Sequence, residues 1–224
     1  MVKERRRFPQ GLVPICSEPR QRRYGLHRLV LSESCLFAGV SLRVGAGEAL
    51  IVTGANGTGK TTLLRMLAGL SAPEAGEIQW QGQRVGPFAP ELRAAVAFSG
   101  HLPALKDELT AEENLASLLA LEGSAASRES LTEALDDVAL SRQRSLPARV
   151  LSQGQRRRIG LARLSLVSRP LWILDEPLAA LDAAGAELLT RLLGRHLANG
   201  GLAVVATHSA LGLPESRVSS LALN

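Results

Sequence analysis

The segment Glu48–Thr61, EALIVTGANGTGKT, decides the fold of this 224-residue chain. Its first six residues are mostly apolar, which favours a short buried strand. The next eight match the pattern G-x-x-x-x-G-K-[ST] of a phosphate-binding loop, and Lys60 begins a helical pattern. Glycines in such a loop let backbone N–H groups converge on phosphate oxygens, because no Cβ blocks a left-handed turn. This order of strand, loop and helix predicts an α/β fold that binds a nucleoside triphosphate.

The two residues that end the loop carry the expected chemistry toward phosphate. Lys60 would place a mobile positive charge at the β- and γ-phosphates. The N-terminus of the following helix adds a partial positive charge. The hydroxyl of Thr61 is a candidate ligand for Mg²⁺.

Two further strands are expected to end at the same site. The apolar run Leu171–Leu174 predicts a buried strand, so Asp175 and Glu176 follow it at the edge where open α/β sheets bind ligands. Asp175 could hold Mg²⁺ directly or through water, and Glu176 could orient or deprotonate an attacking water. His208 follows the strand Leu202–Ala206, where a hydrogen bond to the γ-phosphate or to water would report which nucleotide is bound.

The rest of the chain predicts an α/β core with a helical subdomain near residues 100–165. Thr110–Glu113 and Ser152–Gln155 match the capping box that opens a helix. Strands are expected at 29–31, 36–44, 48–53, 77–85, 94–99, 171–174, 202–206 and 217–223. Helices are expected at 60–68, 110–121, 128–140, 152–167 and 183–198.

Composition narrows the class of protein. The first 28 residues hold eight basic and two acidic side chains, whereas the remaining 196 hold 18 basic and 19 acidic ones. The basic character therefore belongs to an N-terminal extension, which we place at residues 1–25. This extension could bind anionic lipid or nucleic acid, or it could have no binding partner. Seven aromatic residues offer no evident platform for stacking bases. Cys16 and Cys35 form no CxxC pair, which excludes a disulfide framework or zinc ribbon and favours a reduced, cytoplasmic setting.

A second anion-binding helix terminus is expected at Leu151–Gln155, LSQGQ. One chain already has a complete phosphate loop, so a second one within the same molecule is redundant. In a head-to-tail pair, however, Ser152 of one copy can face the γ-phosphate held by the other. Residues 142–169 hold eight arginines and no acidic residue, and we expect most of these arginines to lie on a solvated helix face.

These motifs, in this order, resemble those of ATP-binding-cassette ATPases. The resemblance covers residues 26–210 and includes the phosphate loop, L-S-x-G-Q, I-L-D-E-P, A-L-D and T-H. The segments Gly100–Leu115 and Pro170–Pro177 are more narrowly similar to the ATP-binding subunit of the cytochrome c maturation haem exporter. The implied fold is an ATPase domain over residues 26–224, with a P-loop core, an antiparallel β subdomain and a helical signature subdomain.

The resemblance also implies a role for each motif residue. Glu176 would be the catalytic base, His208 the switch histidine and Lys60 a further catalytic group. Mg²⁺ would be held by Thr61 and Asp175. ATP would be held by Gly54, Ala55, Asn56, Gly57, Thr58, Gly59, Lys60, Thr61 and Thr62, and the ATP of the partner copy would be contacted by Ser152, Gln153, Gly154 and Gln155.

Two more positions concern the assembly that the resemblance implies. Asp182 would lie in the loop that crosses the dimer, and His101 occupies the position that contacts Mg²⁺ and couples to the membrane partner. Two copies closing on two ATP molecules would drive integral membrane subunits from the cytoplasmic face of the bacterial inner membrane, with no nucleic acid partner. The chain itself has no run of roughly 20 mostly apolar residues, so any membrane function requires partner subunits.

The sequence departs from the family pattern at four places. His101 stands where cassette ATPases usually carry Gln, which puts its metal role in question. No aromatic residue stands near Leu31, where many cassettes stack the adenine. Gln153 replaces the first signature glycine and Ala179 replaces a frequent Ser, and we expect both to be tolerated.

Three alternatives share part of this pattern. The ATPase of a transporter for another substrate would carry the same motifs. A chromosome or DNA-repair ATPase needs long coiled-coil or zinc inserts, and only 91 residues separate Lys60 from Ser152. A small-molecule kinase shares the phosphate loop but gives no reason for LSQGQ.

Overall fold

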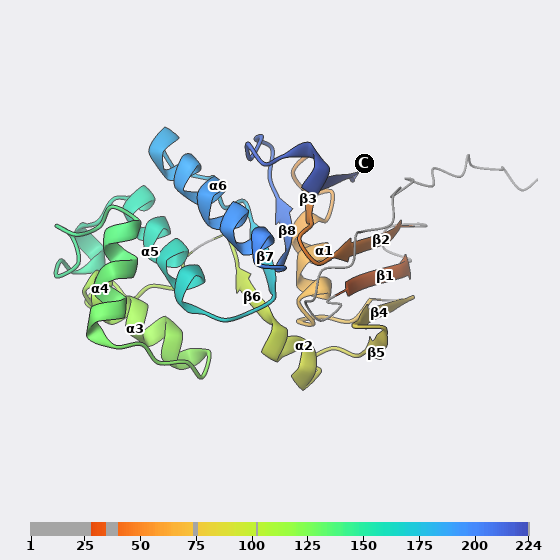
Figure 1. Ribbon diagram of the computed structural model, residues 1–224, viewed down its shortest axis with the longest axis horizontal. Helices are drawn as coiled ribbons and strands as arrows, with labels where there is room; N and C mark the ends of the chain where they lie inside the picture. The colour runs from red at the N-terminus through yellow and green to blue at the C-terminus, as the bar shows by residue number, and fades with distance from the viewer. Residues whose placement is uncertain (1–27, 35–39, 74–75, 102, 224) are drawn as a thin grey trace, which may run out of the picture.

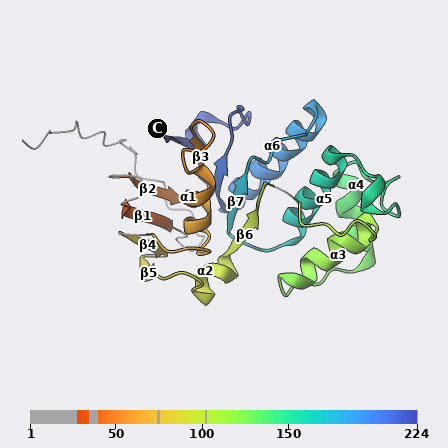
Figure 2. The ribbon, with the colours of Figure 1, turned by 180° about the vertical axis from the view of Figure 1, so that it is seen from behind.

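The computed structural model describes residues 28–34, 40–73, 76–101 and 103–223. A parallel sheet lies in the middle of the molecule, with a small antiparallel sheet on one side and a group of helices on the other (Figure 1). The same arrangement is seen from behind in Figure 2. It confirms the α/β class and the separate antiparallel sheet.

The central sheet has the strand order β6-β7-β8-β3-β9, and all of its neighbouring strands are parallel. The predicted strands for this sheet are confirmed to within two residues at each end. The strands are β3 (Ala49–Thr53), β6 (Val96–Ser99), β7 (Leu171–Asp175), β8 (Leu202–Ala206) and β9 (Val218–Ala222).

The second sheet is antiparallel, with the order β2-β1-β4-β5. Its strands are β1 (Arg28–Ser34), β2 (Val40–Gly45), β4 (Glu77–Trp80) and β5 (Gln83–Val85). The single strand expected at 77–85 is wrong. Gln81 and Gly82 both have positive φ, 55° and 78°, and these two left-handed residues make the tight turn of a hairpin. The strand expected at 36–44 is confirmed from residue 40 onward, and residues 36–39 lie outside the described residues.

The helices match the expectations closely, with two corrections. They are α1 (Lys60–Leu67), α2 (Pro90–Ala95), α3 (Ala111–Leu121), α4 (Arg128–Asp137), α5 (Gln153–Leu166) and α6 (Ala183–Ala198), with 3₁₀ turns at Ala148–Val150 and Glu215–Arg217. Helix α4 ends three residues before the expected Leu140, because Ala139 is left-handed with a φ of 58°. Helix α2 was not expected, although Pro90 at its first turn is a typical helix start.

Both predicted capping boxes are present. The side chain of Thr110 accepts a hydrogen bond from Glu113 N, and the Glu113 carboxylate accepts one from Thr110 N, at the start of α3. Ser152 and Gln155 repeat this exchange at the start of α5. These bonds satisfy backbone donors that a helix N-terminus leaves without intrahelical partners.

The parallel strands contribute alternately to two hydrophobic cores. One core contains α3, α4, α5 and α6, and it receives Ala97, Trp172, Leu174, Ala203 and Val205 from the sheet. The other contains α1 and α2, and it receives Leu50, Val52, Leu171, Ile173, Leu202, Val204 and Ala206. Successive residues of a strand point to opposite faces, so both faces of the sheet are covered. This explains why the strand sequences are continuously apolar.

Several expectations fall outside the described residues. These are the basic extension at residues 1–25, Cys16 and Cys35. Among the helices that the structure describes, none combines the length and apolar character that a bilayer crossing requires.

A tight contact at the amino-terminal edge of the sheet joins α6 to β7 and β8. The rings of Trp172 and His196 stack with centroids 4.0 Å apart, and His196 Nε2 lies 3.0 Å from the carbonyl oxygen of Leu202. Burial lowers the pKa of His196, which favours its neutral form. A Cβ on Gly201 would lie 2.3 Å from this imidazole ring, so a glycine at this position is a packing requirement.

Gly201→Ala is expected to lower the free energy of unfolding by about 1–3 kcal/mol, because the added methyl group displaces His196 from its stack. Gly194→Ala in α6 is the matched control, since its Cβ would have no neighbour within 4 Å. We expect it to be neutral or to stabilise by up to about 1 kcal/mol through helix propensity. Urea unfolding followed by circular dichroism measures both variants, and equal effects would contradict the packing argument.

Candidate functional site

The phosphate loop and the predicted residues Asp175, Glu176 and His208 meet at the carboxyl ends of three neighbouring strands, β7, β8 and β3. Asp175 is the last residue of β7, and Glu176 follows it directly. His208 lies two residues after β8, and the phosphate loop follows β3. Short backbone bonds hold these ends together, from Glu176 N to Ala206 O (2.9 Å) and from Thr207 N to Val52 O (3.1 Å).

The loop between β3 and α1 depends on its glycines for two different reasons. Gly54, Gly57 and Gly59 all have positive φ, at 146°, 89° and 94°. A Cβ on Gly54 would lie 2.5 Å from Leu223 O, so no side chain fits there. A Cβ on Gly57 would meet nothing within 4 Å, so its backbone angle and the open approach to its N–H explain the glycine.

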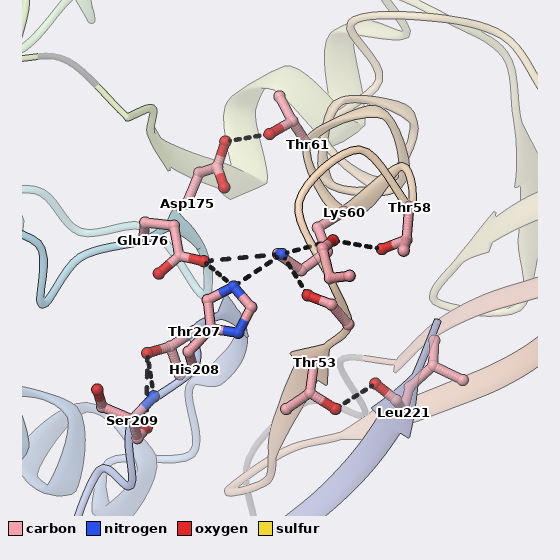
Figure 3. Close-up of polar contacts among 12 residues, drawn as sticks. Thr53, Thr58, Lys60, Thr61, Asp175, Glu176, Thr207, His208, Ser209 and Leu221 are labelled. Atoms are coloured by element: carbon pink, nitrogen blue, oxygen red, sulfur yellow. Dashed lines mark hydrogen bonds and ion pairs between the residues drawn. The ribbon is translucent and has the colours of Figure 1, made fainter. Parts of the chain in front are cut away.

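Lys60 is the centre of the site (Figure 3). Its side chain is only 8% exposed. The ammonium donates hydrogen bonds to Gly54 O (2.6 Å) and Ala55 O (3.2 Å), and it lies 3.0 Å from His208 Nε2. Glu176 Oε1 lies 4.0 Å from the same nitrogen. The loop, β7 and β8 therefore converge on one cation.

Glu176 places one carboxylate oxygen, Oε1, beside both Lys60 and His208. His208 Nε2 is 3.4 Å from Glu176 Oε1 and 3.0 Å from Lys60 Nζ, so this nitrogen can donate to Glu176 when it carries a proton and can accept from Lys60 when it does not. The Glu176 carboxylate therefore lies beside the phosphate loop and in contact with both Lys60 and His208.

Thr61 and Asp175 fit a magnesium ion. Thr61 Oγ1 donates to Asp175 Oδ2 over 2.8 Å, and the carboxylate is buried. Mg²⁺ prefers oxygen ligands at 2.0–2.1 Å in octahedral geometry, which puts adjacent ligands about 2.9 Å apart. The two oxygens therefore already have the spacing of neighbouring ligands. In the described ranges, no cluster of three or more His, Cys, Asp or Glu side chains could hold a metal, so the protein would supply only Thr61 and Asp175.

We call Lys60, Glu176 and His208 the Lys60 cluster. Among the polar contacts of the described residues, none joins this cluster to the predicted residues Ser152–Gln155 or to Asp182. Ser152 lies exposed at the start of α5, where its hydroxyl accepts the hydrogen bond from Gln155 N. Asp182 caps α6, because its Oδ1 accepts from Gly185 N (2.9 Å) and from Arg158 Nη2 (2.6 Å). The Gly185 hydrogen bond, and then the Arg158 contact, lower the pKa of Asp182.

The expectation that most arginines of residues 142–169 lie on a solvated helix face does not hold for Arg157 and Arg163, which are buried. Arg163 pairs with Glu122 and donates to Phe98 O (2.8 Å). Arg157 donates to three backbone carbonyls, one of which belongs to His101. The His101 side chain itself is exposed. Sequence reasoning missed Arg157 because its acceptors are backbone oxygens, which every residue has.

Relatives of this chain share most of its length. The family model described as ABC transporter matches residues 37–179. The chain is 45% identical over 194 residues to the cytochrome c biogenesis ATP-binding export protein CcmA of Dechloromonas aromatica, covering 87% of this chain and 95% of that protein. It is also 45% identical to the protein of the same name from Nitrosomonas europaea, covering 87% and 92%.

Solved structures agree with the fold. A structure described as a dimeric, post-hydrolysis state of the ATP-binding cassette MJ0796 bound to ADP and Pi has a TM-score of 0.70 and 26% identity, covering 81% of this chain and 88% of that one. A putative ABC transporter ATP-binding protein from Pyrococcus furiosus has a TM-score of 0.75 at 22% identity, covering 88% and 97%.

At 45% identity over nearly the whole of each relative, and with the family model spanning more than half of its residues, this chain belongs to the ABC transporter family and, within it, to the CcmA group of cytochrome c biogenesis ATP-binding export proteins.

Proposed function

We propose that this chain hydrolyses ATP at the Lys60 cluster and uses the energy to drive an export step in cytochrome c biogenesis. The observation that carries the chemistry is the position of the Glu176 carboxylate at the end of β7, where Oε1 lies 4.0 Å from Lys60 Nζ and 3.4 Å from His208 Nε2. A carboxylate beside the phosphate loop can accept a proton from an attacking water. The ABC transporter family match supports ATP as the nucleotide.

The phosphate loop binds the triphosphate in this proposal. The nine residues Gly54–Thr62 surround the phosphates with backbone N–H groups, and Gly57 leaves the approach open. The Lys60 ammonium then donates to phosphate oxygens in place of some loop carbonyls. Thr61 and Asp175 would hold Mg²⁺, which supplies positive charge to the β- and γ-phosphate oxygens when it is bound.

Glu176 orients the water and accepts its proton as the oxygen attacks the γ-phosphorus. His208 lies between Lys60 and Glu176, within 3.4 Å of both. A neutral His208 can accept from Lys60, and it can exchange this bond for one to the γ-phosphate or the water. It would therefore respond to the presence of the terminal phosphate.

A second copy would complete the site. Ser152 and Gln153 are exposed at the capped N-terminus of α5, where backbone dipoles favour an anion. We propose that Ser152–Gln155 of one copy contact the γ-phosphate bound by the other. The dimeric solved structure of a related ATP-binding cassette supports this arrangement. Asp182 would lie in the same interface, next to the start of α6.

The biological role follows from the relatives. Their name, cytochrome c biogenesis ATP-binding export protein CcmA, supports a peripheral subunit that acts with integral membrane partners. We propose the cytoplasmic face of the bacterial inner membrane as its location and haem export, or release of a haem-loaded chaperone, as the step it drives. The coupling residue toward the membrane subunits would be His101, whose side chain is exposed.

Glu176→Gln is expected to keep ATP binding and to slow ATP turnover at least about 100-fold, the scale of losing a general base. Lys60→Ala is expected to lose binding instead, because it removes the buried cation. Phosphate release and direct ATP titration separate the two effects, and Glu187→Gln on the exposed face of α6 is the control. Normal turnover by Glu176→Gln would disprove its role as the base.

Ser152→Ala should leave ATP binding to the single chain within about 2-fold while reducing turnover and ATP-dependent dimerisation. The substitution also removes a helix cap, which costs about 1 kcal/mol. Thr110→Ala is the matched control, since it breaks the other capping box, on α3. Light scattering in the Glu176→Gln background measures the dimer. Full turnover by Ser152→Ala, or by a protein that stays monomeric with ATP, would reject the paired site.

In a bacterium whose own relative of this chain has been deleted, the wild-type gene is expected to restore the formation of c-type cytochromes with covalently attached haem. The same gene with Glu176→Gln should fail. Haem staining after denaturing electrophoresis measures the product. An active ATPase that restores nothing would point to a transporter for another substrate.

A further inference from the structure

Arg157 joins three parts of the chain that are far apart in the sequence. It lies in the second turn of α5 and is 8% exposed. Its Nε donates to Ala179 O (3.1 Å), its Nη2 to Glu176 O (2.6 Å) and its Nη1 to His101 O. Helix α5, which begins within the LSQGQ motif and which we call the signature helix, is thus bound to the loop after β6 and to the turn after β7.

The three carbonyls explain why a buried cation is tolerated. Among the ion pairs of the described residues, none includes Arg157, so its hydrogen bonds are all to neutral acceptors. Burial lowers the pKa of Arg157, while the nearby carboxylates of Asp175 and Glu176 oppose that shift. A guanidinium stays charged in proteins, so the side chain needs those acceptors. Its position is therefore fixed by the backbone of the catalytic turn.

The turn Glu176–Ala180 requires support because two of its residues are left-handed. Glu176 has a φ of 48° and Ala180 a φ of 62°, and each such non-glycine conformation costs of order 1–3 kcal/mol. Arg157 holds Glu176 O and Ala179 O, on both sides of the turn. The first turn of α5 also packs closely on it, because a Cβ on Gly154 would lie 2.8 Å from Ala180 O.

The neighbouring arginines have other partners. Arg156 pairs with Asp107 and donates to Ala148 O (2.9 Å). Arg158 pairs with Asp182 and donates to Val138 O (3.3 Å). Of three consecutive arginines, only Arg157 contacts the backbone of Glu176.

We propose that Arg157 is a positioning residue that holds the Glu176 carboxylate in its reactive geometry and transmits movements of the signature helix α5 to it. The inference rests on the proposed function, in which Glu176 is the base. Because one guanidinium binds both the Glu176 turn and the His101 loop, any shift of α5 against the sheet acts on both together.

Arg157→Gln and Arg157→Lys test this role. Both should reduce kcat for ATP hydrolysis about 10- to 100-fold, because a small misplacement of a catalytic group has effects of this size. The ATP dissociation constant should stay within about 2-fold, since Arg157 touches none of the phosphate loop in the described contacts. Arg156→Gln is the matched control, because it also loses an ion pair and a hydrogen bond to a backbone carbonyl. Its kcat should stay within about 2-fold of the wild-type value.

A double-mutant cycle separates positioning from a general loss of structure. In the Glu176→Gln background, Arg157→Gln should have no further effect on the residual rate, because its effect passes through that carboxylate. If the two substitutions instead reduce kcat independently, so that their fold-losses multiply in the double variant, the inference is overturned. A normal kcat in Arg157→Gln would also overturn it. A kcat loss that only follows the folded fraction measured by thermal unfolding would also overturn it. If Arg157→Gln does not fold, Arg157→Lys carries the same criteria.

The outcomes distinguish this inference from the proposed function. Normal turnover by Glu176→Gln alone would reject Glu176 as the base. Slow ATP turnover by Glu176→Gln together with normal turnover by Arg157→Gln would reject only the positioning role of Arg157.

Discussion

The buried ammonium of Lys60 is the constraint on which the rest of the site depends. A charge with so little exposure is tolerated only where acceptors surround it. Two loop carbonyls and His208 Nε2 meet that requirement. These acceptors follow β3 and β8, which are neighbours in the sheet, and the carboxylate of Glu176 follows β7, the next strand. The strand order thus brings the Lys60 ammonium, the Glu176 carboxylate and the His208 imidazole together.

Strain in the turn Glu176–Ala180 has a related explanation. The chain must leave β7 sharply so that Asp175 stays at Thr61 while Glu176 lies near Lys60. Left-handed φ angles at Glu176 and Ala180 achieve that change of direction at a conformational cost. Contacts from α5 offset the cost, through the hydrogen bonds of Arg157 and the close approach of Gly154. Helix α5, which begins within the LSQGQ motif, therefore also stabilises the strained turn.

Sequence reasoning succeeded where a local pattern fixes a local structure. The phosphate loop, both capping boxes and the continuously apolar strands follow from spacing and residue type alone. It failed where a turn of only two residues interrupts a strand-like run, and where the deciding contact is made by backbone atoms that are remote in the sequence. The hairpin at Gln81–Gly82 carries a short turn signal inside an otherwise strand-like run. Arg157 resembles its two neighbours until the folded chain shows which carbonyls it meets.

Backbone contacts also explain why departures from the family pattern can be accommodated. His101 and Ala179 both meet Arg157 through their carbonyl oxygens, which any residue supplies, so a change of side chain leaves these bonds in place. Gln153 is exposed in the first turn of α5 and has no left-handed backbone, so a glycine is not needed there. Gly154 differs, because its missing Cβ leaves room for Ala180 O. The signature motif thus contains one position fixed by packing beside another that is free to vary.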